Sequence, residues 1–223
     1  MTQKTAIILG ATGLTGGHLL RLLLKDDRYK KIKLFSRKAV GIEDEKLQEY
    51  LLDLFELKNQ QEDFRADEVF CCIGTTRAKT PDKNLYKKID YGIPVAAAEL
   101  CKKNKIDTFI VISALGASSE SRVFYNQLKG QMEKEVVLKE IPKTHILQPS
   151  LIGGLRKERR FGEWLVKKVF LLLNNLMIGP FKKYRSINPQ TIARCMVWLA
   201  NNPCKKIRIP SDEIAELGVT KNG

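Results

Sequence analysis

The segment Gly10-Ala-Thr-Gly-Leu-Thr-Gly16 decides the fold class of this chain of 223 residues. It follows the apolar run Ala6-Ile-Ile-Leu9 and leads into the leucine-rich run His18-Leu-Leu-Arg-Leu-Leu-Leu24. In a strand–turn–helix unit the first glycine permits the tight turn, the second lets the backbone approach a pyrophosphate, and the third lets the helix pack on the strand. The spacing is G-x-x-G-x-x-G rather than G-x-G-x-x-G, but with these flanking periodicities it predicts a dinucleotide-binding turn that includes Gly10 and Gly16.

Apolar strands alternate with amphipathic helices along most of the chain. Strands are expected near residues 4–9, 32–36, 48–52, 68–73, 107–113, 144–148 and 206–210. Helices are expected near residues 14–25, 54–63, 82–105, 120–139, 161–175 and 189–201, with a bend in the third near Pro94. This alternation predicts an α/β fold of the Rossmann type, a doubly wound parallel sheet covered on both faces. We expect one NAD(P)-binding domain over residues 1–223, to which residues 151–205 contribute a small C-terminal substrate lobe that caps the carboxyl edge of the sheet.

Composition and targeting signals narrow the class further. Hydrophobic residues make up 43% of the chain and charged residues 29%, as in ordinary globular proteins. No secretory signal precedes the first strand, no apolar stretch is long enough to span a bilayer, and the five cysteines lack metal-ligand spacing. These features favour a cytoplasmic location. Cys71 and Cys72 are expected on opposite faces of a strand, as core residues rather than a redox pair.

The basic excess, which gives a net charge of +14, is concentrated in residues 151–223. Four clusters carry it, at residues 156–160, 167–168, 182–185 and 205–208. A positive field attracts anions, so the clusters could bind an acidic small-molecule substrate or a protein partner. The alternative is a solvated basic surface with no ligand. No nucleic-acid-binding motif accompanies the charge, so nucleic acid is not an expected partner. The apolar stripe from Trp164 to Leu173 favours a packing helix over peripheral membrane contact, and the chain is expected to be a monomer or a homodimer.

The residues after the second strand predict which dinucleotide binds. An NAD site usually places an acidic residue there to accept from the ribose 2′-hydroxyl. This chain instead has Ser36, Arg37 and Lys38, a hydroxyl and two cations that suit a 2′-phosphate. We therefore expect NADP(H) to be preferred over NAD(H). Asp53 is expected to accept from the adenine amino group, and Ile73-Gly74-Thr75 to pass beneath the cofactor.

Tyr125 and Lys129 lie four residues apart, on one face of a predicted helix. Ser113 ends the strand before that helix. This trio suits hydride transfer to a carbonyl group, because the phenol can donate a proton to the developing alkoxide while the hydroxyl holds that oxygen. The lysine charge is expected to lower the pKa of the phenol toward working pH while the lysine binds the nicotinamide ribose. The alternative is a packed tyrosine beside a solvated lysine.

With these motifs the chain resembles an atypical short-chain dehydrogenase/reductase of the NmrA-like group, and most closely the Tat-interacting oxidoreductase-like family. The matching motifs are Gly10-Ala-Thr-Gly-Leu-Thr-Gly16, Cys72-Ile-Gly-Thr-Thr-Arg77, Tyr125-Asn-Gln-Leu-Lys-Gly130, Gln148-Pro-Ser-Leu151 and Arg160-Phe-Gly-Glu-Trp-Leu-Val166.

The resemblance implies roles for residues at each of these motifs. The pyrophosphate would be held by Thr12, Gly13, Leu14 and Thr15, the 2′-phosphate by Arg37 and Lys38, and the ribose by Ile73, Gly74 and Thr75. Tyr125 and Lys129 would be the catalytic pair, and Pro149, Ile152 and Arg160 would lie at the nicotinamide end. The chain departs from the pattern at Asp90, where short-chain reductases often have an asparagine that relays protons.

The leading interpretation is therefore an NADPH-dependent oxidoreductase that acts on a small carbonyl-type substrate, with Tyr125 as the proton donor. The alternative is an NADP(H)-sensing regulatory or protein-binding module with little or no turnover, in which the nucleotide stabilises one conformation of the lobe. No metal is expected, because His18 and His145 have no partner at ligand spacing.

Overall fold

Parallel strands form one sheet in the computed structural model, which describes residues 3–153 and 179–219. In this part of the chain the sheet has seven strands, in the order β3-β2-β1-β4-β5-β6-β7. They are β1 (Lys4–Leu9), β2 (Tyr29–Ser36), β3 (Leu47–Leu51), β4 (Glu68–Cys71), β5 (Thr108–Ile112), β6 (Lys143–Gln148) and β7 (Arg208–Pro210). Every neighbouring pair is parallel, so all the carboxyl ends lie at the same edge.

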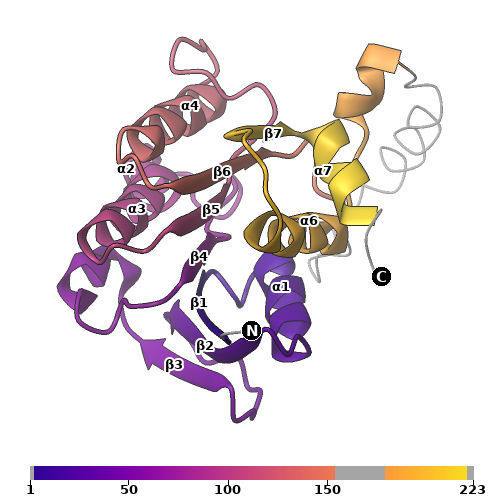
Figure 1. The fold of residues 1–223 in the computed structure, drawn as a ribbon. Helices are drawn as coiled ribbons and strands as arrows, with labels where there is room; N and C mark the ends of the chain where they lie inside the picture. The colour runs from indigo at the N-terminus through magenta and orange to yellow at the C-terminus, as the bar shows by residue number, and fades with distance from the viewer. Residues whose placement is uncertain (1–2, 154–178, 220–223) are drawn as a thin grey trace.

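The strand order reverses direction between β1 and β4. The chain runs outward from β1 through β2 to β3, then returns to the other side of β1 and runs outward from β4 to β7 (Figure 1). Connections therefore leave the carboxyl ends of β1 and β4 in opposite directions, which opens a crevice at this point of the edge. Ligands of open α/β sheets bind in such a crevice.

Helices cover both faces of the sheet (Figure 1). One face carries α1 (Leu14–Leu24), α6 (Pro189–Asn201) and α7 (Ser211–Val219). The other carries the 3₁₀ helix η1 (Leu54–Gln60), α3 (Ile93–Lys103) and α4 (Phe124–Val137). The short helix α2 (Lys83–Lys87) and the π-helix η2 (Lys88–Gly92) lead into α3, and the 3₁₀ helix η3 (Gly179–Tyr184) precedes α6.

The core has two layers, one on each face of the sheet, and successive side chains of β1 point into them alternately. Ala6 and Ile8 point to the layer of α1 and α6, whereas Ile7 and Leu9 point to the layer of α3 and α4. Successive strand side chains face opposite sides, so a strand of continuous apolar residues is buried on both. Helix α6 contributes side chains spaced three and four residues apart, which places its apolar stripe on the sheet side: Ile192, Cys195, Met196 and Leu199.

The predicted helices and strands match the described ones except at four places, one of which is the 3₁₀ helix η3, which was not predicted. The expected helix over 82–105 consists of α2, η2 and α3 in succession, with the π-helical turn lying just before Pro94. The expected helix over 54–63 is the shorter 3₁₀ helix η1, and α7 was not predicted. Ser211 followed by Asp212 and Glu213 is a helix-start signal that could have found α7. The expected helix over 161–175 lies outside the described residues.

The expectation of a lobe over 151–205 needs correction for α6. This helix packs against α1 on a face of the sheet rather than over the carboxyl edge. Its apolar stripe is the physical reason, since those side chains are buried in one cluster with the leucines of α1. For residues 154–178 the lobe stays a prediction. Among the described helices, none combines the length and the apolar character that crossing a bilayer requires.

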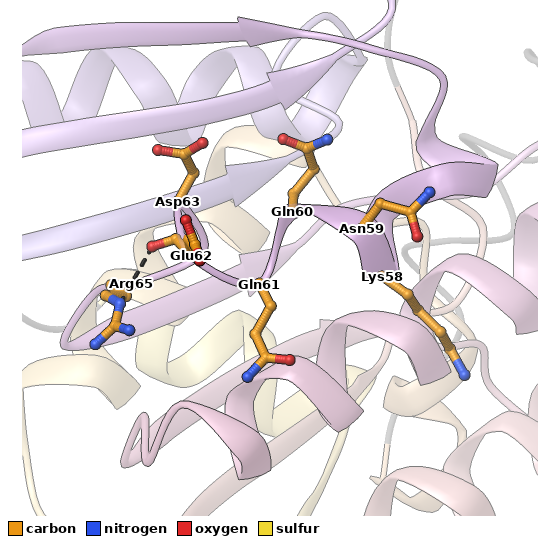
Figure 2. A pocket seen from close by; sticks show the side chains of 7 residues that line it. All are labelled: Lys58, Asn59, Gln60, Gln61, Glu62, Asp63 and Arg65. Atoms are coloured by element: carbon orange, nitrogen blue, oxygen red, sulfur yellow. Dashed lines mark hydrogen bonds between the residues drawn. The ribbon is translucent and has the colours of Figure 1, made fainter.

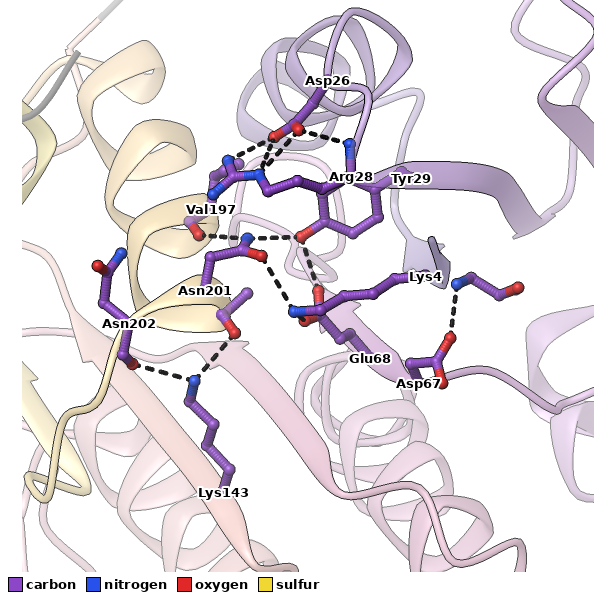
Figure 3. A network of polar contacts seen from close by, with 12 residues as sticks. Lys4, Asp26, Arg28, Tyr29, Asp67, Glu68, Lys143, Val197, Asn201 and Asn202 are labelled. Carbon is purple, nitrogen blue, oxygen red and sulfur yellow. Dashed lines mark hydrogen bonds and ion pairs between the residues drawn. The ribbon is translucent and has the colours of Figure 1, made fainter. Parts of the chain in front are cut away.

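A network of polar contacts joins α6 to the amino edge of the sheet (Figure 3). Glu68, only 2% exposed, pairs with Lys4 and accepts a hydrogen bond of 2.7 Å from the Tyr29 hydroxyl. Asn201, the last residue of α6, accepts from Lys4 Nζ at 3.0 Å and donates to the Tyr29 hydroxyl at 2.8 Å. Lys143 Nζ donates to the carbonyl oxygens of Ala200 and Asn202, at 2.9 and 3.1 Å, which satisfies the end of the helix. This network stabilises the edge opposite to the one where ligands of this fold bind.

Candidate active site

The carboxyl edge of the sheet brings the predicted site residues together. Each of six strands ends just before one or more of them, and all six strands run in the same direction. From β3 across the sheet to β6, these groups begin at Asp53, Ser36, Gly10, Ile73, Ser113 and Pro149. The point between β1 and β4 at which the strand order reverses therefore lies beside Gly10 and Ile73, at the centre of this row.

The glycine turn has the geometry of a phosphate cradle. Gly10 has φ +85°, a left-handed conformation that favours glycine, and its carbonyl oxygen accepts from Gly13 N at 3.0 Å. A Cβ on Gly16 would lie 2.1 Å from Gly10 O, so only glycine permits this close packing of helix on turn. Within the described chain, no side chain caps the start of α1 at Gly13. The N–H groups in the first turn of α1 and the positive end of the helix dipole suit a pyrophosphate.

The residues after β2 and β3 have mixed roles. Arg37 and Lys38 are exposed at the end of β2. The Ser36 hydroxyl is buried and donates to the Lys38 carbonyl oxygen at 2.8 Å, so it shapes the turn and is not free to donate to a phosphate in this arrangement. Asp53 is exposed at the start of η1, where its Oδ1 accepts from Phe55 N at 3.0 Å.

Asp90 lies at the centre of the candidate site, although the sequence marked it only as a departure from the family pattern. It is carried by the π-helix η2 and is fully buried. Its Oδ2 accepts from Thr75 N at 2.8 Å, and its Oδ1 lies 3.0 Å from Lys129 Nζ. A Cβ on Gly74 would lie 3.5 Å from Asp90 Oδ1, so the loop after β4 runs directly over the carboxylate. Asp90 thus ties this loop to α4.

Lys129 is a buried cation rather than a solvated one. Its side chain is 2% exposed, and its Nζ donates to the Ile112 carbonyl oxygen at 3.5 Å as well as facing Asp90. Burial by itself lowers the pKa of Lys129, but the carboxylate of Asp90, together with Tyr125, outweighs burial and raises the pKa above 10.5. The lysine is therefore protonated at any pH at which the protein works.

Tyr125 opens α4 beside this pair and remains 37% exposed. Its ring meets the ring of Tyr86 edge to face, with centroids 6.3 Å apart. Loss of water around the hydroxyl raises the pKa of Tyr125 above 10.0; the charge of Lys129 opposes this shift and the charge of Asp90 adds to it. The expectation that Lys129 lowers the pKa of the phenol toward working pH is wrong in its net direction. Loss of water is the main reason, and the charge of Asp90 adds to it against the charge of Lys129.

Ser113 has a partner that sequence reasoning missed. Its hydroxyl donates to Glu133 Oε1 at 2.6 Å, and both side chains are buried. Glu133 lies one helical turn after Lys129, so the i, i+4, i+8 series from Tyr125 was the signal that could have found it. Gln148 Nε2 donates to the same carboxylate oxygen at 2.9 Å, and Arg208 Nε donates to the other at 2.7 Å.

The expected nicotinamide end of the site is described only in part. Pro149 is buried, and its carbonyl oxygen accepts from Leu115 N at 2.9 Å. Ile152 forms a single parallel bridge with Ile187. Arg160 lies outside the described residues, as do the basic clusters at 156–160 and 167–168 and the apolar stripe that begins at Trp164.

His145 and the paired cysteines have structural surroundings. His145 is buried with Nδ1 2.8 Å from the Lys206 carbonyl oxygen, and burial lowers its pKa. Cys71 and Cys72 face opposite layers of the core, as expected from their adjacent positions in a strand, and burial raises the pKa of Cys71 to about 11. In the part of the chain that the structure describes, no group of three or more His, Cys, Asp or Glu side chains could hold a metal ion.

A hollow of about 520 Å³ lies away from this site (Figure 2). Its lining is polar and comes from the end of η1 and the loop before β4, so it lies toward the amino edge of the sheet: Lys58, Asn59, Gln60, Gln61, Glu62, Asp63 and Arg65. All of these side chains are exposed or half-buried. The hollow thus offers no buried polar group that would fix the orientation of a ligand.

Comparison with known proteins now places the chain. A sequence model of a family described as NAD(P)H-binding matches residues 10–148, from the first glycine of the turn to the end of β6. The chain belongs to this family. Protein HTATIP2 of Rattus norvegicus is 32% identical over 174 residues, which cover 76% of this chain and 72% of that protein. The mitochondrial protein FMP52 of Debaryomyces hansenii is 31% identical over 205 residues, which cover 89% and 88%. The resemblance to the Tat-interacting oxidoreductase-like family is confirmed.

Solved structures confirm the fold of this NAD(P)H-binding chain. A UDP-glucose 4-epimerase from Thermotoga maritima, solved with UDP-glucose, has a TM-score of 0.68 at 15% identity, over 92% of this chain and 76% of that chain. A thiolation-reductase di-domain from an archaeal non-ribosomal peptide synthetase has a TM-score of 0.70 at 15% identity, over 95% and 71%. Likeness at this level of identity shows the Rossmann-type fold alone.

The relatives correct the expected location. The FMP52 proteins of Scheffersomyces stipitis and Debaryomyces hansenii are named as mitochondrial, which contradicts the cytoplasmic location expected from the sequence. The expectation rested on the lack of a secretory signal and on free cysteines. These features argue only against the secretory route, so they do not distinguish one reducing compartment from another.

Proposed function

We propose that this protein is an NADPH-dependent oxidoreductase that transfers hydride to a small carbonyl-type substrate, with Tyr125 as the proton donor. One observation carries the proposal: the half-exposed phenol of Tyr125 opens α4 one helical turn before Lys129, which pairs with Asp90 directly beneath the loop after β4. A phenol at the carboxyl edge of a dinucleotide-binding fold supports a role for Tyr125 as the acid. Perturbed titratable groups at such an edge are typical of active sites.

The residues present fit an NADP(H) cofactor. The uncapped start of α1 and the tight packing of Gly16 on Gly10 make a cradle that suits a pyrophosphate, held by Thr12, Gly13, Leu14 and Thr15. Arg37 and Lys38, exposed after β2, would bind the 2′-phosphate that distinguishes NADP(H) from NAD(H). The loop of Ile73, Gly74 and Thr75, fixed by Asp90, would support the ribose.

When bound, the nicotinamide supplies the hydride, and the protein supplies the proton. Tyr125 donates its phenolic proton to the oxygen of the substrate as negative charge develops there. Lys129 stays protonated at this step, and it holds the ribose and limits the charge that builds up on the phenol. Because the pKa of Tyr125 is raised above 10.0, the phenol carries its proton at neutral pH, as a proton donor must.

Replacement of Tyr125 by Phe tests the proposal. The variant lacks only the hydroxyl, so it should abolish NADPH oxidation with any active member of a panel of small carbonyl compounds and leave the dissociation constant for NADPH nearly unchanged. Turnover that survives in Tyr125→Phe would rule out the phenol as the acid. If the wild type oxidises NADPH with no compound of the panel and an acidic protein co-purifies only when NADPH is present, a nucleotide-sensing binding module is the better description.

A further inference from the structure

The hydrogen bond between Ser113 and Glu133 fixes which way the serine hydroxyl points. Its length is 2.6 Å between Ser113 Oγ and Glu133 Oε1, a distance typical of a hydroxyl donating to a carboxylate. Ser113 is 3% exposed and Glu133 is 2% exposed, so water does not compete for either group. A hydroxyl has one proton and two lone pairs. The proton of Ser113 is therefore committed to Glu133.

The other contacts of Glu133 also come from hydrogen-bond donors. Gln148 Nε2 donates to Oε1 at 2.9 Å, and the guanidinium of Arg208 donates to Oε2 at 2.7 Å. Three donors converge on the two oxygens. A carboxylate only accepts, so its two oxygens can take all three of these donors. The side chain of Arg208 is half-exposed, so it brings a positive charge from the surface to the buried carboxylate of Glu133.

From these contacts we propose that Glu133 is a positioning residue that makes Ser113 a hydrogen-bond acceptor in the active site. This proposal rests on the proposed function in one respect: the group that Ser113 contacts is taken to be an oxygen of the substrate. A carbonyl oxygen offers only lone pairs, so Ser113 cannot bind it in this state. A hydroxyl offers a proton, so Ser113 binds the alcohol form.

This role differs from the one expected from the sequence, in which Ser113 holds the developing alkoxide as a donor. Because the serine proton is committed to Glu133, Tyr125 rather than Ser113 donates to the oxygen of a carbonyl. The site then binds the alcohol more tightly than the carbonyl through Ser113, and that preference shifts the equilibrium between the two bound forms toward the alcohol. Glu133 does not touch the substrate, and its influence passes entirely through Ser113.

Neutron diffraction from crystals of the perdeuterated wild-type protein decides the assignment directly. We expect the deuteron of Ser113 on the line from Oγ to Glu133 Oε1, and Glu133 without a deuteron. A deuteron that points away from Glu133, or one carried by Glu133 itself, would overturn the proposal. This measurement needs no substrate, so its result is independent of whether the protein is a reductase.

Binding of a ketone and its alcohol measures the consequence. In Glu133→Gln the carbonyl oxygen stays with Arg208, and the amide N–H₂ faces Ser113 and Gln148, whose own amide turns its oxygen toward it. Ser113 then accepts from this N–H₂, and its proton is released toward the substrate. With cyclohexanone and cyclohexanol as probes on the NADP⁺-loaded protein, we expect the ratio of cyclohexanone affinity to cyclohexanol affinity to rise by about 3- to 10-fold, the value of one hydrogen bond.

The Ser113→Ala background is the matched control for that ratio. In Ser113→Ala, adding Glu133→Gln should leave the ratio unchanged, because the residue through which Glu133 acts is gone. The same rise in both backgrounds would show that Glu133 acts by another route and would overturn the proposal. If neither probe binds to the wild type, reduction of small cyclic ketones is contradicted as the function, whereas the deuteron position still decides the role of Glu133.

Discussion

Lys129 Nζ lies 3.0 Å from Asp90 Oδ1, and the two side chains are only 2% and 1% exposed. The pair joins the first turns of α4 to the π-helix η2, and through the bond from Thr75 N to Asp90 it also holds the loop after β4. A buried ion pair is stable only because each charge compensates the other, so the loss of one partner leaves an uncompensated charge in the core.

Removal of one partner should therefore destabilise the protein more than removal of both. We expect Lys129→Met and Asp90→Asn each to lower the free energy of unfolding by about 3 kcal/mol or more, and the double variant to lose less than either single variant. Urea denaturation of the four proteins measures these differences. Additive losses in the double variant would mean that the two charges do not compensate each other.

The rate of carbonyl reduction should be constant through neutral pH and fall only in the alkaline range. Tyr125 must carry its proton to donate it, so activity is present below the pKa of the phenol and is lost as the pH rises through that pKa, which lies above 10.0. Asp90 raises this pKa, so Asp90→Asn should move the alkaline loss of kcat/KM to lower pH. Glu99→Gln removes an acidic side chain of α3 that pairs with Lys58, and should leave the profile in place.

Gly16→Ala should disrupt the cofactor turn. The added Cβ would lie 2.1 Å from Gly10 O, a backbone atom that cannot move without changing the turn. We expect the affinity for NADPH to fall by at least about 10-fold, with a lower melting temperature. Gly17→Ala is the matched control, because its Cβ would lie 3.3 Å from Ala11 O and alanine is otherwise the better helix former. Equal losses of NADPH affinity in both variants would contradict the cradle at Gly16.

Arg37 and Lys38 should determine the preference for NADPH over NADH. The double variant Arg37→Ala/Lys38→Ala should weaken NADPH binding by about 10-fold or more, since charge-assisted bonds to a phosphate are lost, and leave NADH binding nearly unchanged. Lys30→Ala/Lys31→Ala removes the same charge from exposed positions at the other end of β2 and is the control. Isothermal titration with both nucleotides tests this, and a parallel loss of both affinities would contradict it.

Asn201 should stabilise the fold from the edge opposite the active site. Asn201→Ala removes contacts to Lys4 Nζ, the Tyr29 hydroxyl and the Val197 carbonyl oxygen, so we expect a loss of about 1–3 kcal/mol in unfolding free energy. Asn202→Ala removes one side-chain bond, to the Trp198 carbonyl oxygen, and should lose less than about 1 kcal/mol. NADPH affinity should be unchanged in both variants, and a large change in it would contradict the separation of the two edges.

The sequence predicted the strands, most helices and the edge of the sheet where the site lies. Those predictions depend on local patterns, since strand and helix periodicities and the turn that begins at Gly10 are readable within a few residues. All the predicted strands are present, with ends that differ by a few residues. Helix α7 was missed although its start signal at Ser211 is local.

Contacts between distant segments could not be predicted in the same way. The sequence placed Tyr125 and Lys129 on one helix face, but the pairing of Lys129 with Asp90 depends on how η2 and α4 pack. The shift in the pKa of Tyr125 also depends on how far folding removes water from the phenol and on the opposing charges of Lys129 and Asp90. The bond between Ser113 and Glu133 likewise joins a strand end to a helix face, a relationship that only the folded chain defines.

Helix α6 has a consequence for how the polypeptide is made. It covers the α1 face of the sheet with Ile192, Met196 and Leu199, yet it is synthesised after six of the seven described strands. Until it leaves the ribosome, the leucines of α1 lack the helix that packs on them, and a nascent chain with such a face is prone to aggregate. Chaperone demand should therefore peak just before translation reaches Pro189 and fall once α6 has emerged.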